Sequence, residues 1–157
     1  MEEQDSLHLI GSPDSDPNSY LLYLSFEGCE FDENRPHSAK TTQGRLFEKF
    51  QELMLRKKVY LDSNITLTSM AELLEISPGY LSQWINTNFG LHFNDFINSH
   101  RIAQAERMLL DPSYDNYTIH GIALESGFNT KSSFYRAFKK LTGLTPTEFI
   151  KSKQKKS

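Results

Sequence analysis

Residues 123–149 read ALESGFNTKSSFYRAFKKLTGLTPTEF, and this stretch decides the fold. Gly127 is a conformationally permissive turn residue that follows a short apolar helix pattern. Either Asn129 or Thr130 can cap the next helix, which the pattern predicts over residues 131–142. A short helix, a tight turn and a longer helix together indicate a helix-turn-helix unit.

The helix predicted over residues 131–142 has two different faces. Phe134, Phe138 and Leu141 recur at helical spacing and are predicted to point into the core, and Gly143 ends the helix. The outward residues are Lys131, Ser132, Tyr135, Arg136 and Lys139.

An earlier part of the chain repeats this pattern. GLHFNDFI at residues 90–97 matches GLTPTEFI at residues 143–150 at an offset of 53. Ala71 matches Ala123 at an offset of 52, so one residue is inserted in the turn of the second copy. Two copies of one small helical unit are the simplest interpretation.

The first copy has the same layout as the second. A short helix is predicted over residues 66–74, followed by a turn at residues 75–76. Ser77 is then a helix cap with Pro78 in the first turn of a helix that runs to about Phe89. The outward positions on that helix are Gly79, Ser82, Gln83 and Asn86.

Helical periodicity covers the rest of the chain after Arg45. A helix is predicted from Arg45 to about Lys58, and a continuous connector helix over residues 94–110, which Asp111 and Pro112 end. The sequence therefore predicts an all-α, homeodomain-like fold in which a long linker helix joins two helix-turn-helix units. The linker spans roughly 25 Å at 1.5 Å per residue. That length is compatible with adjacent major-groove segments about 34 Å apart.

Charge divides the chain into two predicted domains, residues 1–44 and residues 45–157. The first is a turn-rich, mostly irregular arm with one candidate strand over residues 20–26, and its nine acidic and two basic side chains give it a net charge of −7. The second carries a net charge of +4, and the stretch after Asp111 alone carries +5, so an anionic partner is expected to dock at this basic end. The arm can dimerise, inhibit or have no role; one hypothesis is that it covers the basic domain.

Composition excludes several classes of protein. The single Cys29 allows no internal disulfide and no cysteine-rich zinc site, and the five scattered histidines lack metal-ligand spacing. No phosphate-binding glycine loop, HExxH or GxSxG motif occurs, so we expect neither an enzyme nor a cofactor. The N-terminus lacks a basic signal region and no apolar run is long enough to cross a bilayer, so a cytoplasmic location is expected.

These motifs resemble the DNA-binding domain of AraC/XylS-type bacterial transcription regulators. The resemblance covers residues 45–150 and is most specific over residues 123–149. Regulators of the Bacteroidetes have segments similar to SPGYLSQWIN and KSSFYRAFKKLTGLTP. In those regulators the domain often follows a sensor region. The resemblance implies seven helices, with the third and sixth entering successive major grooves and the long fourth joining them.

The resemblance also implies which side chains meet DNA. The implied base-contacting residues are Gly79, Ser82, Gln83, Lys131, Ser132, Tyr135 and Arg136. The expected phosphate-contacting residues are Asn86, Asn129, Lys139 and Lys140. The amide of Gln83 suits adenine and the guanidinium of Arg136 suits guanine. No basic residue lies between Lys58 and Arg101, so the second unit is expected to anchor and the first to discriminate weakly.

The predicted function is a sequence-specific transcription regulator that binds double-stranded DNA, in the simplest case as a monomer, and can contact RNA polymerase. It is expected to be an activator, although the sequence leaves repression open. The alternative is a helical protein-interaction module, or the output fragment of a larger sensor, with weak DNA binding of its own. Trp84 is expected at the core edge rather than against a base. Arg101 is equally compatible with a structural ion pair and with a phosphate contact.

Overall fold

The computed structural model describes residues 42–155, which contain seven α-helices and no strand. The α-helices are α3 (Thr42–Gln51), α4 (Leu67–Leu73), α5 (Pro78–Phe89), α6 (Phe93–Leu110), α7 (Ile119–Glu125), α8 (Lys131–Thr142) and α9 (Pro146–Gln154). A π-helical turn, η2 (Glu52–Arg56), and two 3-10 turns, η3 (Val59–Leu61) and η4 (Pro112–Tyr114), complete the set. The all-α fold class is confirmed, while the candidate strand at residues 20–26 lies outside the described residues.

The predicted repeat is present in the backbone geometry of both units. In the first turn the N–H of Ile76 donates to the carbonyl of Ala71 at 3.0 Å, and in the second the N–H of Phe128 donates to the carbonyl of Ala123 at 3.0 Å. The residue just before each donor is left-handed: Glu75 has φ 59° and Gly127 has φ 98°. The two corners are therefore built in the same way, although only the second uses glycine.

Side-chain caps fix where the second helix of each unit begins. The Ser77 hydroxyl accepts from the N–H of Tyr80 at the start of α5. Thr130, rather than Asn129, does the same for α8 by accepting from the N–H of Ser133. Gly90 and Gly143 are left-handed and end the two helices. The predicted limits of α5 and α8 are confirmed.

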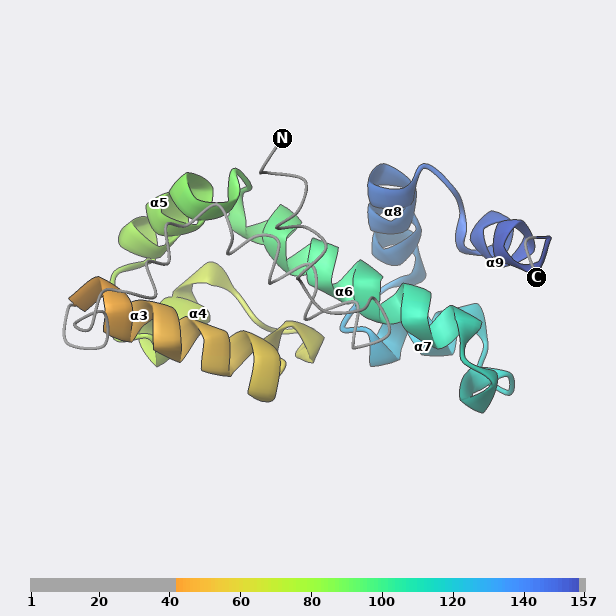
Figure 1. Ribbon diagram of the computed structural model, residues 1–157, viewed down its shortest axis with the longest axis horizontal. Helices are drawn as coiled ribbons and strands as arrows, with labels where there is room; N and C mark the ends of the chain where they lie inside the picture. Colours follow the sequence, from red (N-terminus) through yellow and green to blue (C-terminus); the bar gives the residue numbers. More distant parts are fainter. Residues whose placement is uncertain (1–41, 156–157) are drawn as a thin grey trace, which may run out of the picture.

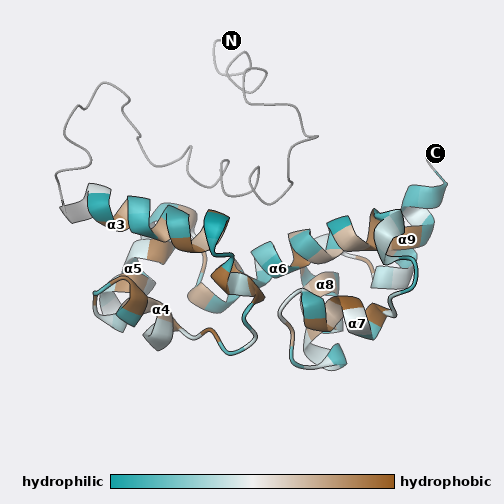
Figure 2. Ribbon diagram, turned by 90° about the horizontal axis from the view of Figure 1, so that it is seen from below, coloured by the Kyte–Doolittle hydropathy of each residue, from teal (hydrophilic) through white to brown (hydrophobic). Residues whose placement is uncertain are grey.

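Helix α6 belongs to two separate cores. Phe93, Phe96 and Ile97 in its first half pack into the core of the first unit, while Ile102 and Met108 in its second half pack into the core of the second. Figures 1 and 2 show the two units side by side along this helix. Because α6 is continuous through both cores, it is the linker helix that the sequence predicts, beginning one residue earlier than expected.

Two details differ from the sequence prediction. The first helix begins at Thr42 rather than Arg45, and its last turn widens into the π-helical η2. Leu141 was expected in the core but is 46% exposed, and the small Ala137 is buried beside Phe134 and Phe138 instead. Helical spacing gives the direction in which Leu141 points, but it cannot say whether another element lies opposite.

Candidate nucleic-acid interface

The exposed residues of α5 form the first half of the candidate interface. Gly79, Gln83 and Asn86 are exposed and Ser82 is half-buried, so the predicted positions lie on one accessible side of the helix. A Cβ added at Gly79 would meet nothing within 4 Å, which leaves the first turn of α5 open to a close approach. None of the twelve residues of α5 carries a charge.

Tyr80 is a further exposed residue of α5 that was not predicted from the sequence as part of the interface. Its side chain is 42% exposed, and it lies three positions before Gln83 on α5. Residues three apart are neighbours on a helix surface. The available sequence signal was the break in apolar spacing, since Leu81 rather than Tyr80 continues the buried stripe with Ile85.

The exposed residues of α8 form the second half. Lys131, Ser132, Arg136 and Lys139 are exposed, and Tyr135 is half-buried. The ring of Tyr135 packs edge-on against Phe134, and the ammonium of Lys131 lies 5.5 Å from its centroid. Tyr135 is therefore anchored by the core on one side and available to a ligand on the other.

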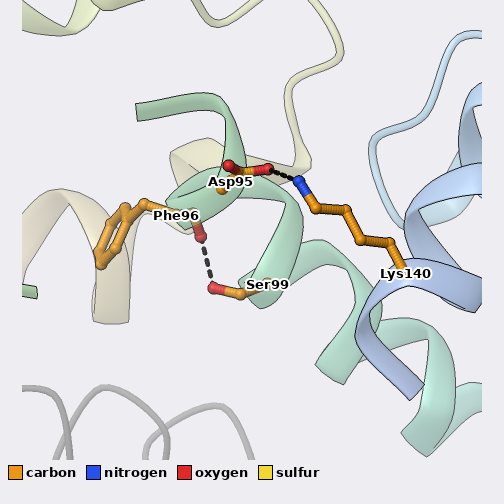
Figure 3. Close-up of polar contacts among 4 residues, drawn as sticks. All are labelled: Asp95, Phe96, Ser99 and Lys140. Atoms are coloured by element: carbon orange, nitrogen blue, oxygen red, sulfur yellow. Dashed lines mark hydrogen bonds and ion pairs between the residues drawn. The ribbon is translucent and has the colours of Figure 1, made fainter. Parts of the chain in front are cut away.

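Two of the residues predicted to contact phosphate are engaged within the protein. Lys140 Nζ donates to Asp95 Oδ1 at 2.8 Å, which joins α8 to the first half of α6 (Figure 3). Asn129 Nδ2 donates to the carbonyl of Ser63 at 3.3 Å. Each side chain keeps a further N–H donor, but the present bond fixes its direction, and Asp95 offsets the charge that Lys140 would bring to a phosphate.

Charge is distributed very unevenly between the two helices. Helix α8 carries four basic side chains and no acidic one, and α9 adds Lys151 and Lys153. Between Val59 and His100 the chain has four acidic residues and no basic residue. A polyanion would be attracted chiefly to the second unit.

Two further residues have the structural places that the sequence left open. Trp84 is half-buried at the edge of the core, as predicted, and its ring centroid lies 4.9 Å from that of Phe50. In place of an ion pair, Arg101 bonds two backbone carbonyls: its Nε donates to the carbonyl of Tyr60 at 2.6 Å and its Nη2 to the carbonyl of Asp62 at 2.9 Å. No local sequence signal could reveal these partners, which lie 41 and 39 residues away. A phosphate contact of Arg101 stays a prediction.

Residues 42–155 contain neither a membrane-spanning helix nor a cluster of metal-ligating side chains. Over residues 42–155, no helix is both long and apolar enough to cross a membrane. In the same part of the chain, no group of three or more histidine, cysteine, aspartate or glutamate side chains is placed to hold a metal ion.

Comparison with known sequences identifies related regulators. The family described as "Helix-turn-helix domain" matches residues 70–152. An uncharacterized HTH-type transcriptional regulator of Staphylococcus aureus (strain COL) is 33% identical over 92 residues, which cover 59% of this chain. The regulator YtdP of Bacillus subtilis (strain 168) is 29% identical over 93 residues. The chain spans only 12% of the length of either of these curated relatives.

Comparison with solved structures agrees. The C-terminal domain of AraT, a response regulator from Geobacillus stearothermophilus, is 33% identical with a TM-score of 0.59, and the match covers 68% of this chain and 84% of that one. The C-terminal domain of the response regulator yesN from Fusobacterium nucleatum is 33% identical with a TM-score of 0.58, covering 68% and 98%. The DNA-binding domain of AdpA, solved in complex with a target DNA, is 16% identical with a TM-score of 0.60, covering 71% and 94%, and shows the shared fold.

These relatives are transcription regulators rather than enzymes, in agreement with the motif inventory. The matched residues include both recognition-helix candidates, α5 and α8, and the whole of α6. The duplicated units, the shared linker helix and the matches together assign the family: the chain belongs to the AraC/XylS-type helix-turn-helix DNA-binding domains.

Proposed function

We propose that this chain is the DNA-binding part of a sequence-specific transcription regulator, which inserts α5 and α8 into two adjacent major-groove segments. The observation that carries the proposal is the pair of twelve-residue helices, α5 and α8, each with an exposed polar side and each packed on one continuous helix, α6. Major grooves admit an α-helix, and their base edges offer donors and acceptors to polar side chains.

The two helices are proposed to divide the work. Helix α8 would anchor the protein, because Lys131, Arg136 and Lys139 supply charge and donors for bases and phosphates. Helix α5 would discriminate between sequences through Gln83 and Ser82, with little attraction to the backbone. Gly79, Ser132 and Tyr135 complete the proposed base-contacting set, and Asn86, Asn129 and Lys140 the proposed phosphate-contacting set.

The partners beyond DNA are part of the same proposal. The two units in one chain can bind a two-part site without a second copy, so we propose a monomer. We also propose that the protein acts in the cytoplasm, where bacterial DNA is found, and that it activates transcription through contact with RNA polymerase.

One observation favours a second candidate, a protein-interaction module. The first unit exposes apolar surface at Leu73 and Tyr80, whose side chains are 53% and 42% exposed. Both residues lie in the stretch between Val59 and His100 that contains no lysine or arginine. Apolar residues beside acidic ones suit a protein partner better than a polyanion. In that case α5 would bind a protein and DNA binding would be weak.

The test is selection of sites from a random duplex library, followed by titration of the enriched duplex at two salt concentrations. The proposal predicts two short sequence blocks about one helical turn apart, and an affinity that falls steeply as salt increases. Enrichment of a single block would reject the reading role of α5. No salt-dependent binding to any duplex would favour the interaction module.

A further inference from the structure

The two units touch each other beside α6, at a junction formed by residues 60–63 of the first unit and residues 127–129 of the second. Arg101, on the middle of α6, lies between the two segments. Its Nε donates to the carbonyl of Tyr60 at 2.6 Å and its Nη2 to the carbonyl of Asp62 at 2.9 Å. On its other side the guanidinium carbon lies 5.6 Å from the ring centroid of Phe128.

Gly127 allows the two segments to approach this closely. A Cβ added at Gly127 would lie 2.6 Å from the carbonyl oxygen of Tyr60 and 2.9 Å from Arg101 Nε. Both distances are shorter than real Cβ contacts, and the oxygen belongs to the backbone, so the segments would have to separate. The first unit has Glu75 at the equivalent turn position, where the side chain is exposed and pairs with Lys49 of α3.

A further hydrogen bond and one ion pair cross between the units. Asn129 Nδ2 donates to the carbonyl of Ser63 at 3.3 Å, at the edge of the junction. Lys140 and Asp95 meet at 2.8 Å, away from the junction (Figure 3). Their side chains are 64% and 36% exposed, and an ion pair that solvent reaches stabilises a structure only weakly. The half-buried guanidinium of Arg101 is the stronger connection, because it bonds two backbone carbonyls at once.

We propose that Arg101 is a positioning residue that locks the two helix-turn-helix units together and thereby fixes the separation and relative angle of α5 and α8. A continuous helix alone leaves each unit free to tilt on its own core contacts, since the two cores occupy different halves of α6. The junction removes this freedom. The consequence for DNA rests on the proposed function. If that function holds, the Arg101 contacts set the spacing that the protein accepts between the two sequence blocks.

The lock is tested first without DNA. Spin labels are placed on α5 and α8 through Gln83→Cys and Arg136→Cys in a Cys29→Ser background, and the distance distribution between them is measured in the full chain. We expect a narrow distribution in the parent and a clearly broader or shifted one after Arg101→Met, which keeps the aliphatic stem but removes every donor. An unchanged distribution in folded Arg101→Met protein would overturn the proposal.

Two variants provide the comparison. Arg107→Met removes a guanidinium that bonds Gln104 on the same helix at 2.6 Å, so it should leave the distribution unchanged. Arg101→Lys keeps the charge but cannot bond both carbonyls in the same fork, so it should give an intermediate width. If Arg101→Met does not fold, the broadening in Arg101→Lys decides the question, and equal widths in Arg101→Lys and the parent would count against the lock.

The second test measures spacing on DNA with the duplex that the unmodified protein selects. Inserting one base pair between the blocks rotates them by roughly 35° relative to each other. We expect this insertion to weaken the unmodified protein by about tenfold or more and Arg101→Met by about threefold or less, given typical costs of misplacing contacts. Equal losses would overturn the spacing role. If the protein selects no duplex, the proposed function fails, while the label distances still decide the lock.

Discussion

At the scale of single residues, Arg136 offers the sharpest test of the interface. Its side chain is exposed on α8, and a guanidinium can bond both acceptors of a guanine. We expect Arg136→Ala to weaken binding to the selected duplex by roughly 1–3 kcal/mol and to relax one base position. Lys151→Ala on α9 is a charge-matched control that should not relax any position. Unchanged affinity and sequence preference in Arg136→Ala would remove this residue from the interface.

Lys139 and Lys140 are adjacent basic residues with different surroundings. Lys140 pairs with Asp95 at 2.8 Å, whereas Lys139 is exposed and has no such salt bridge among the described residues. Each phosphate neutralised contributes about one unit to the slope of log affinity against log salt. We therefore expect Lys139→Ala to reduce that slope by about one, and Lys140→Ala by clearly less. Equal reductions would mean that DNA displaces Asp95 from Lys140.

His100 predicts how stability depends on pH. It is buried on α6, with its ring 5.6 Å from that of Tyr60 and 4.7 Å from that of Phe96, and burial lowers its pKa to about 4. The His100 imidazole takes up its proton near pH 6.5 in the unfolded chain and only near pH 4 in the folded chain. Between these values the unfolded chain binds more protons, so the stabilisation that comes from keeping His100 neutral is complete above pH 6.5 and is lost as the pH falls towards 4. We expect the loss to be roughly 3 kcal/mol in the free energy of unfolding.

The measurement is chemical denaturation of the unmodified protein and of His100→Gln across this pH range. Carboxylates titrate in the same window, so the difference between the two proteins is the quantity to compare. The difference should narrow as the pH falls, because only the unmodified protein has the histidine to protonate. His120→Gln, at an exposed position on α7, should run parallel to the unmodified protein; a parallel course for His100→Gln as well would contradict the prediction.

At the scale of the elements, the close packing of helices at Ala123 stabilises the second unit. Ala123 is fully buried, and its carbonyl accepts the turn hydrogen bond from Phe128. Because a larger side chain at this fully buried position would have to displace its packed neighbours, Ala123→Leu should destabilise the fold by about 1–3 kcal/mol. Leu124→Ala, at the next residue and 48% exposed, should change stability by about 0.5 kcal/mol or less. Equal melting temperatures for Ala123→Leu and the unmodified protein would disprove this packing.

At the scale of the whole molecule, the acidic segment before α3 has an expected effect on DNA affinity. Residues 1–44 carry a net charge of −7 and residues 45–157 a net charge of +4. The acidic segment should therefore compete with DNA for the basic domain, residues 45–157. Since α3 begins at Thr42, the deletion that keeps this helix removes residues 1–41. We expect tighter binding after the deletion, with a larger gain at low salt than at high salt. Unchanged affinity at low salt would reject the idea that this segment screens the interface.

The sequence by itself determined the two helix-turn-helix units, the limits of α5 and α8, and the duplication. Ser77, Thr130, Gly90 and Gly143 act on backbone groups within a few residues, so their effect is readable from local sequence. The repeat at offsets of 52 and 53 predicted two copies of one helical unit, and the matching turn hydrogen bonds of the structure agree with it. The interface residues on α5 and α8 followed from the same periodicity together with the family resemblance, and their contacts with DNA stay a prediction.

Only the tertiary structure decided which side chains are engaged across the units. Lys140 and Asp95 are 45 residues apart, and Arg101 is 41 and 39 residues from the carbonyls that it bonds. Leu141 has core spacing on α8 yet lies exposed. Helical periodicity gives the direction of a side chain relative to its own helix, but its partner depends on how separate helices pack. That is the physical reason why the recognition helices were readable from the sequence and the junction between the two units was not.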